Sequence, residues 1–283
     1  MKWLVYGSRG WIGSMITSRL REMEEVVIEA EGRADDEVQV ERMLLEHTPD
    51  RVLCLIGRTH GPGHPTIDYL EHKDRLLINV RDNLYAPIVM TILCQKYNIH
   101  LTYLGTGCIF NNLVHDKQYN ENDEPDFFGS SYSVVKGFTD RLLHFYSDTV
   151  LNVRIRMPIV GYHHERNFIT KIVHYEYICS IQNSMTVLPD MIPVLIDMVK
   201  KQVTGTINLT NPGTIEHNEI LTMYKAYVDP DFTWKNFTND EQNHVLLSER
   251  SNNHLDTSRL EKSYPNILNI RDSVRLLLQH WTR

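Results

Sequence analysis

Short apolar runs alternate with longer amphipathic stretches along the first half of the chain. Runs of mainly apolar residues at 2–6, 25–30, 51–56 and 100–104 predict buried strands, and stretches of helical periodicity separate them. The order β-α-β-α-β-α-β predicts a parallel sheet with right-handed crossovers. The stretch 73–97 reads as a helix that Pro87 interrupts, because proline cannot donate a hydrogen bond to the preceding turn.

The second half continues with fewer strands and more polar sequence. A strand is expected over 151–157 and another over 205–209, and helices are expected over 191–201, 217–227 and 271–281. The chain has no internal repeat and no low-complexity linker. We expect residues 1–158 to form a dinucleotide-binding domain and residues 159–283 to form a mainly substrate-binding lobe that is interleaved with the first.

The turn after the first strand carries a glycine pattern. Gly7, Gly10 and Gly13 form G-x-x-G-x-x-G between a strand and a helix that extends to about residue 23. Glycines in this order allow a tight turn, a close approach of the backbone to a pyrophosphate, and close packing of helix on strand. The free N–H groups of the helix N-terminus favour phosphate. The fold expected is therefore α/β, a Rossmann-type doubly wound parallel sheet with a smaller C-terminal lobe.

The end of the second strand bears on the choice of cofactor. Arg33, helped by Arg9 in the glycine loop, could meet a 2′-phosphate by charge and fork geometry, which favours NADPH. Glu29 and Glu31 leave NADH open, since an acid there binds a ribose diol. The residues expected to contact the cofactor are Gly7, Arg9, Gly10, Trp11, Ile12, Gly13, Arg33, Gly57, Asn83 and Lys136.

A tyrosine and a lysine stand four residues apart in the first turns of a predicted helix. Tyr132 and Lys136 therefore share one helix face. A cation beside a phenol lowers its pKa from about 10, which suits a proton donor to a carbonyl oxygen. By itself the Y-x-x-x-K spacing also fits an ordinary amphipathic helix.

The fourth strand ends in Leu104-Gly105-Thr106-Gly107-Cys108. If the extended geometry persists, Thr106 and Cys108 point to the same side, at the carboxyl edge where parallel sheets bind ligands. Thr106 can hydrogen-bond a substrate carbonyl, and Cys108 can act as an acid or base. A turn hydroxyl and a small buried residue remain the ordinary alternatives.

Composition narrows the function classes. A net charge of −7 and a pI near 6.0 argue against a nucleic-acid or membrane-surface binder. No apolar run reads as long enough to span a bilayer and no signal peptide precedes the first strand, so a cytoplasmic location is expected. The four cysteines have no C-x-x-C spacing, and we expect reduced thiols and no metal site.

These motifs together resemble the extended short-chain dehydrogenase/reductase superfamily. More closely, the chain resembles the bifunctional 3,5-epimerase/4-reductases that complete UDP-rhamnose synthesis. The segments that carry the resemblance are GWIG at Gly10–Gly13, GR at Gly32–Arg33, R-x-N at Arg81–Asn83, TGCIF at Thr106–Phe110, GSxYSxxK at Gly129–Lys136, RMPI at Arg156–Ile159, RNFITKI at Arg166–Ile172, NSMTVL at Asn183–Leu188, TNPG at Thr210–Gly213, HNEI at His217–Ile220 and RSNN at Arg250–Asn253.

The resemblance implies a role for each matching residue. Tyr132 matches the reductase proton donor, Lys136 its partner, and Thr106 the hydroxyl beside it. Cys108 and Lys171 match the pair assigned to epimerisation. The implied reaction converts UDP-4-keto-6-deoxy-D-glucose to UDP-L-rhamnose by epimerisation through enolates and NADPH-dependent reduction.

The chain departs from the family pattern in places. The family's N-A-A-G is here Cys54-Leu55-Ile56-Gly57, and the loop at 58–65 is a little longer. The helical asparagine that faces the cofactor could be Asn83 or Asn79. Asn167 and Arg250 are the expected substrate-binding residues, although asparagine also caps helices well and a surface arginine is common.

Two other functions remain open at this stage. One is a dTDP-4-dehydrorhamnose-type reductase without epimerase activity, and the other is a non-catalytic NADP-binding regulatory subunit. The chain lacks a second glycine-rich βα unit, so a separate 4,6-dehydratase is the expected pathway partner. The sequence leaves a homodimer open and does not decide between UDP and dTDP.

Overall fold

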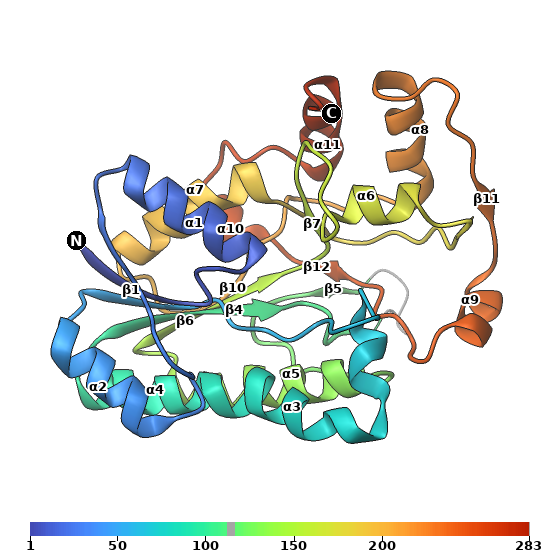
Figure 1. Cartoon of the computed structure of the whole chain (residues 1–283). Helices are drawn as coiled ribbons and strands as arrows, with labels where there is room; N and C mark the ends of the chain where they lie inside the picture. The colour runs from blue at the N-terminus through green and yellow to red at the C-terminus, as the bar shows by residue number, and fades with distance from the viewer. Residues whose placement is uncertain (112–116, 283) are drawn as a thin grey trace.

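The computed structural model describes residues 1–111 and 117–282, and its centre is a sheet of six parallel strands (Figure 1). The order across the sheet is β2-β1-β3-β4-β6-β10. The strands are β1 (Lys2–Tyr6), β2 (Val26–Glu29), β3 (Arg51–Cys54), β4 (His100–Thr106), β6 (Val150–Ile155) and β10 (Gly205–Asn208). The order reverses between β1 and β3, where such sheets bind ligands beyond their carboxyl ends. The predicted Rossmann-type doubly wound sheet is confirmed.

Helices cover both faces of this sheet (Figure 1). One face carries α1 (Trp11–Glu22), α7 (Leu188–Lys200) and α10 (Ser258–Ser263). The other carries α2 (Glu37–His47), α4 (Ala86–Lys96) and α5 (Ser131–Leu143). Because both faces are covered, the strands read as nearly continuous apolar runs.

The stretch 73–97 folds as one interrupted helical path. It comprises η2 (Lys73–Arg75), α3 (Leu76–Val80), a π-helical turn η3 (Arg81–Tyr85) and α4. Pro87 lies in the first turn of α4, where its missing N–H costs nothing, so the irregularity precedes the proline.

One stretch of this path is as long and as apolar as a membrane span. By length and composition, Lys73–Lys96 could cross a membrane, with a mean hydropathy of 1.2 over the tested window. Half of that window is buried within the fold, and α4 packs against α2 and the sheet. Its apolar side chains cover β3 and β4, which accounts for a hydropathy that resembles a membrane span.

A smaller lobe lies beyond the carboxyl edge of the sheet. Its core is formed by α6 (Phe168–Val173), α8 (His217–Tyr227) and α11 (Ile270–Gln279), together with the pair β7 (Pro158–Ile159) and β9 (Thr186–Val187). Strand β10 belongs to the six-stranded sheet, and helix α7 packs on one face of that sheet. Both follow residue 158, so the two parts of the chain are interleaved.

Seven short elements complete the part of the chain that the structure describes. They are η1 (Ile67–Glu71), β5 (Gln118–Tyr119), η4 (His144–Tyr146), β8 (Tyr177–Ile178), β11 (Lys235–Asn236), α9 (Asn239–Val245) and β12 (His254–Leu255). Strand β5 pairs with β12, and β8 pairs with β11. The division at residue 158 stays a prediction.

Candidate active site

A cavity of about 650 Å³ lies where the strand ends meet the smaller lobe. Its walls come from the glycine loop, the segment 55–67, the exit of β4, the start of α5, and segments of the second lobe. The residues predicted from sequence that line it are Gly10, Trp11, Ile12, Gly13, Gly57, Thr106, Cys108, Tyr132, Lys136, Lys171 and Arg250. Residues up to 240 positions apart in the chain are thus brought to one site.

The glycine loop has the geometry that its sequence predicts. Gly7 has a φ of +83°, which favours glycine, and its carbonyl accepts a hydrogen bond of 3.0 Å from the Gly10 N–H. A Cβ on Gly13 would lie 2.0 Å from the Gly7 oxygen, so only glycine fits there. Helix α1 therefore starts directly against β1, and its N-terminus faces the cavity.

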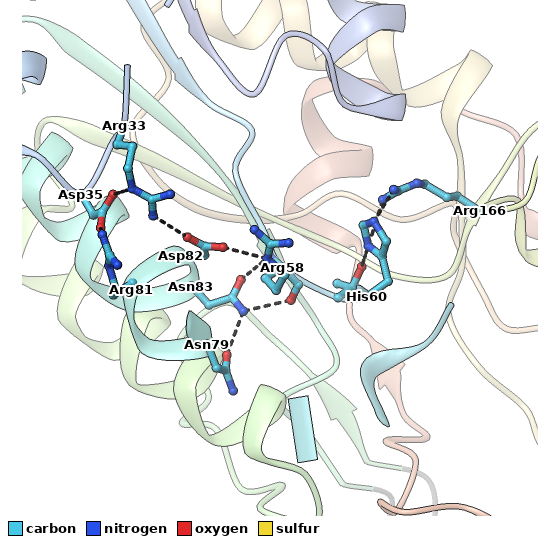
Figure 2. Close-up of polar contacts among 10 residues, drawn as sticks. Arg33, Asp35, Arg58, His60, Asn79, Arg81, Asp82, Asn83 and Arg166 are labelled. Atoms are coloured by element: carbon cyan, nitrogen blue, oxygen red, sulfur yellow. Dashed lines mark hydrogen bonds and ion pairs between the residues drawn. The ribbon is translucent and has the colours of Figure 1, made fainter. Parts of the chain in front are cut away.

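The residues proposed for the adenosine end lie in a chain of ion pairs (Figure 2). Arg33 donates to Asp35 at 2.6 Å and to Asp82 at 3.3 Å. Asp35 also binds Arg81, and Asp82 also accepts from Arg58 at 2.8 Å. Arg33 does not line the cavity, and its guanidinium, which the sequence analysis proposed as a partner of a 2′-phosphate, lies between two carboxylates.

Asn83 was predicted to contact the cofactor, but its side chain binds the backbone of Arg58 instead (Figure 2). It is fully buried, its Oδ1 accepts from the Arg58 N–H at 2.8 Å, and its Nδ2 donates to the Arg58 carbonyl at 2.9 Å. The same amide donates to Asn79 at 2.8 Å. Because these bonds occupy its amide, Asn83 fixes the start of the loop at 58–65 and does not line the cavity, which corrects the sequence prediction.

Helix α5 brings Tyr132 to the cavity. Ser130 caps the helix by accepting from the Ser133 N–H at 3.0 Å. Tyr132 is hydrogen-bonded to Thr106, whose Oγ1 also accepts from the Cys108 N–H at 3.1 Å. A phenol, a hydroxyl and a thiol therefore meet at the end of β4, as the strand spacing predicted.

The electrostatics of Tyr132 differ from the sequence prediction. Burial, followed by the charge of Cys108, raises the pKa of Tyr132 well above 10, and the hydrogen bond with Thr106 acts in the opposite direction only weakly. A raised pKa keeps the phenol protonated at neutral pH. The expectation that Lys136 lowers this pKa is wrong for this arrangement, because desolvation dominates.

Lys136 is bound by a residue that the sequence analysis missed. Its ammonium donates to the Tyr103 hydroxyl and lies 3.4 Å from the Leu104 carbonyl. Burial lowers the pKa of Lys136 to about 8. Tyr103 is an apolar-face residue of β4 and has no sequence signal that separates it from an ordinary core aromatic.

Lys171 reaches the same cavity from α6 in the second lobe. Its Nζ lies 3.4 Å from the Pro65 carbonyl. Burial, followed by the charge of Arg166, lowers the pKa of Lys171. An amine with a lowered pKa gives up its proton more readily than an exposed lysine, which suits the acid–base role that the resemblance implies.

Arg250 lines the cavity but is not free. Its guanidinium binds both oxygens of Asp68, at 2.7 and 3.2 Å, and also donates to the Ser248 carbonyl at 3.1 Å. Asp68 belongs to η1, so the contact joins the two lobes at the edge of the site. A diphosphate could meet the outer edge of this guanidinium only beside the carboxylate.

Two contacts that the sequence analysis did not predict join the walls of the cavity to the second lobe. His60, in the loop at 58–65, accepts from Arg166 of the second lobe at 3.1 Å (Figure 2). Burial, followed by the charge of Arg166, lowers the pKa of His60, so the neutral ring is favoured. Trp11 stacks on His164 with ring centroids 4.8 Å apart, which ties the start of α1 to the same lobe.

Asn167 corrects another sequence prediction. It is fully buried and caps α6 by accepting from the Ile169 N–H at 3.2 Å. It also accepts from the Val160 N–H at 3.3 Å and donates to the carbonyls of Val160 and Tyr162 at 2.9 and 2.8 Å. The alternative of a helix cap therefore holds, and the side chain has no atom left for a ligand.

Replacing Asn167 by alanine is expected to lower stability by about 2–3 kcal/mol, because a cap is lost and buried backbone groups lose their partners. The affinity for dinucleotide should stay unchanged, since Asn167 does not line the cavity. Thermal unfolding and a cofactor titration measure the two effects. A weakened ligand affinity at unchanged melting temperature would restore the binding role.

The described residues can support acid–base chemistry next to a bound dinucleotide. Among residues 1–111 and 117–282, no group of three histidine, cysteine or acidic side chains is arranged to hold a metal ion. The phenol of Tyr132 and the hydroxyl of Thr106 can both bond one substrate oxygen. Cys108 and Lys171 can act on the carbons next to it.

No protein-family model matches the chain. It is 56% identical over 279 residues to the uncharacterized protein L780 of Acanthamoeba polyphaga mimivirus, which covers 97% of this chain and 96% of that protein. It is 37% identical over 278 residues to a bifunctional dTDP-4-dehydrorhamnose 3,5-epimerase/dTDP-4-dehydrorhamnose reductase of Arabidopsis thaliana, over 96% of this chain and 90% of that protein. A trifunctional 4,6-dehydratase/3,5-epimerase/reductase of the same plant is 38% identical, and the chain spans 41% of its length.

Solved structures agree with this grouping. The L780 UDP-rhamnose synthase from the mimivirus superposes with a TM-score of 0.96 at 54% identity, over 99% of each chain. The dTDP-4-dehydrorhamnose reductase from Bacillus anthracis, solved with NADP, has a TM-score of 0.80 at 14% identity over 98% of each chain. The UDP-glucose 4-epimerase of Thermus thermophilus, solved with NAD, has a TM-score of 0.74 at 15% identity over 99% of each chain. The last two establish the fold alone.

Proposed function

The chain belongs to the family of 3,5-epimerase/4-reductases that make nucleotide-linked rhamnose, and from this premise we propose that it converts UDP-4-keto-6-deoxy-D-glucose to UDP-L-rhamnose. The observation that supports this best is the gathering of Thr106, Cys108, Tyr132, Lys136 and Lys171 around one cavity beside a dinucleotide loop. Two sets of groups in one site match a reaction of two parts.

Epimerisation uses the acidity of carbons next to the ketone. The hydrogens at C3 and C5 are both alpha to C4, so removal of either one forms an enolate whose charge rests on O4. Hydrogen bonds from Thr106 and Tyr132 stabilise that oxygen. Of Cys108 and Lys171, one takes the proton and the other returns a proton to the opposite face, which inverts the carbon.

Reduction uses the same oxygen. Gly7, Gly10 and Gly13 would hold the pyrophosphate of a reduced nicotinamide dinucleotide, which when bound would supply the hydride for C4. Tyr132, which burial keeps protonated, gives its proton to O4. Lys136, held by Tyr103 next to the end of β4, places a positive charge beside the reacting groups. One oxyanion site therefore serves both parts of the reaction.

The substrate must come from another active centre. The chain spans 41% of trifunctional relatives whose name also includes a 4,6-dehydratase, and a separate 4,6-dehydratase would supply the keto sugar here. UDP is favoured over dTDP by the 54% identity to a UDP-rhamnose synthase. A cytoplasmic location and a homodimer stay predictions.

One incubation tests the proposal. Purified protein, NADPH and UDP-4-keto-6-deoxyglucose are combined in heavy water, and the product is examined by NMR. UDP-rhamnose with deuterium at C3 and C5 is expected. An unepimerised 6-deoxy sugar would leave a simple reductase, and no turnover with NADPH still bound would favour the regulatory subunit.

Cofactor preference rests on Arg33. Replacing it by alanine is expected to weaken NADPH binding about tenfold while NADH binding changes little, because a charge-assisted contact to the 2′-phosphate is lost. Glu29 lies at the end of β2 and accepts from Ser8 at 3.0 Å, a position that suits a ribose diol and keeps NADH usable. Titrations with both cofactors measure the ratio.

Arg81→Ala is the matched control for Arg33→Ala. Arg81 shares Asp35 with Arg33 but approaches it from η3. The Arg81→Ala variant should change the ratio of NADPH affinity to NADH affinity less than Arg33→Ala does. An unchanged ratio in Arg33→Ala would contradict the assignment to Arg33.

A further inference from the structure

The carboxylate that holds Arg250 lies behind the wall of the cavity. Arg250 lines the cavity, whereas Asp68, whose two oxygens it binds, does not. The two side chains are 23% and 14% exposed, so both charges are largely removed from water. Because desolvation offsets much of the attraction in such a pair, its place beside the cavity is better explained by what Asp68 does to the guanidinium.

The carboxylate fixes the direction in which the Arg250 guanidinium presents its remaining donor groups. Nη2 donates to one oxygen of Asp68 at 2.7 Å and Nη1 to the other at 3.2 Å, a two-point contact that sets the position and the plane of the group. Nη1 also donates to the carbonyl and the hydroxyl of Ser248. Among residues 1–111 and 117–282, the Nε–H has no hydrogen-bond acceptor. Because Asp68 and Ser248 do not line the cavity, the edge that carries Nε is left for a ligand.

Asp68 is itself held in place and stays charged. The hydroxyl of Thr66 donates to it at 2.8 Å, and the hydroxyl of Ser248 donates at 3.1 Å. Burial acts to raise the pKa of Asp68, but the hydrogen bond and the charge of Arg250 outweigh it, so the pKa lies below its ordinary value. The carboxylate is therefore ionised near neutral pH and keeps its hold on the guanidinium.

The short helix η1, which carries Asp68, is fixed to the reacting end of the site. Tyr69 of η1 is buried in one cluster with Tyr132. Glu71, at the end of η1, accepts at 2.9 Å from the backbone N–H of the first residue of α5, the helix that carries Tyr132. A guanidinium held by Asp68 therefore has a fixed place relative to the proposed proton donor.

The cavity as a whole suits an anionic ligand. The charged side chains that line it are Lys136, Glu165, Arg156, Arg166, Lys171 and Arg250. Within the part of the chain that the structure describes, positive groups thus outnumber the single carboxylate, which attracts anions to the cavity. Of these cations, Arg250 is the one whose group is held in a fork by a carboxylate outside the cavity lining.

We propose that Asp68 is a positioning residue, which holds Arg250 from behind so that its remaining edge binds the diphosphate of a sugar nucleotide. The class of ligand rests on the proposed function. Asp68 makes no contact with the ligand and acts through the guanidinium alone. An arginine that is already oriented loses less side-chain freedom on binding than a mobile one, which raises affinity. The charge of the carboxylate acts in the opposite direction, since it weakens the attraction for an anion.

These two effects give opposite predictions for Asp68→Asn, which keeps the shape of the side chain and removes its charge. Loss of orientation should weaken UDP binding about tenfold, whereas relief of repulsion alone should strengthen it. Uridine is the reference ligand, because it has the same base and ribose but no phosphate. The affinities for uridine and NADPH should stay unchanged in the variant. Calorimetric titration of the folded protein measures all three affinities.

A double-mutant cycle shows whether Asp68 acts through Arg250. In an Arg250→Gln background, Asp68→Asn should have no further effect on UDP affinity, because the group that it orients is gone. Glu219→Gln is the matched control. It breaks another two-point contact, that of Glu219 with Arg271, and neither residue lines the cavity. This control should bind UDP as the wild type does.

Ser248→Ala replaces Asp68→Asn if the latter does not fold, because it removes one hydrogen bond from each member of the pair. It should weaken UDP binding about threefold. A folded variant that binds UDP as tightly as the wild type or more tightly, or an equal loss in the Arg250→Gln background, would overturn the inference and leave the proposed function untouched. A wild type that binds UDP no more tightly than uridine would contradict the inference and the proposed substrate together.

Discussion

Replacing Tyr132 by phenylalanine is expected to lower the rate of 4-keto reduction by about 10²–10⁴-fold, because the group that gives a proton to O4 is removed. Tyr132 lies at the cavity beside Thr106, and burial keeps its proton in place at neutral pH. The substitution removes one oxygen and leaves the packing of the ring intact. Oxidation of NADPH at saturating keto sugar measures the effect.

The matched control is Tyr69→Phe. Tyr69 packs against Tyr132 but does not line the large cavity, so its loss of a hydroxyl should leave the reduction rate close to that of the wild type. NADPH affinity should be retained in both variants, which separates chemistry from binding. Reduction at a near wild-type rate in Tyr132→Phe would remove the tyrosine from the proton-donor role.

Replacing Cys108 by serine is expected to reduce deuterium incorporation at C3 and C5 by about 10²–10⁴-fold. A serine hydroxyl occupies a similar volume, but it ionises far less readily than a thiol and is a poor base near pH 7. The variant should still bind NADPH, since the glycine loop is untouched. NMR of the sugar in heavy water measures the exchange directly.

Cys179→Ser is the control for this change. Cys179 is buried in the second lobe and does not line the cavity, so exchange should continue as in the wild type. The reductase half can be tested separately by giving Cys108→Ser a keto sugar that is already epimerised. Normal inversion at C3 and C5 in Cys108→Ser would refute the role of the thiol and, with it, the pairing of Lys171 with Cys108 in epimerisation.

The sequence was sufficient wherever the controlling interactions are local. The glycine loop could be predicted because its geometry depends on nearby residues only. Gly7 has a positive φ, and a Cβ on Gly13 would collide with the Gly7 carbonyl. Tyr132 and Lys136 could be paired because helical spacing alone sets their face. Thr106 and Cys108 could be placed at the ligand-binding edge because parallel strands end there.

Side-chain partners were predicted poorly where they come from distant segments. Lys136 was expected beside Tyr132 but is bonded to Tyr103, because strand β4 passes behind the helix. Asn83 was expected at the cofactor and instead fixes the loop at Arg58. In each case the residue type indicated that the side chain makes polar contacts. Its hydrogen-bond partner, however, depends on which distant segment packs against it.

What the sequence by itself determined was the order of strands and helices, the dinucleotide loop, the shared side of Thr106 and Cys108, and the shared helix face of Tyr132 and Lys136. Each of these follows from periodicity, backbone conformation or the edge geometry of a parallel sheet. The tertiary structure alone decided the charge state of those groups and their supports. Burial raises the pKa of Tyr132, and Arg156 meets the Cys108 segment from β6. Desolvation and contacts between residues far apart in the chain depend on how the two lobes pack, and no local pattern encodes that packing.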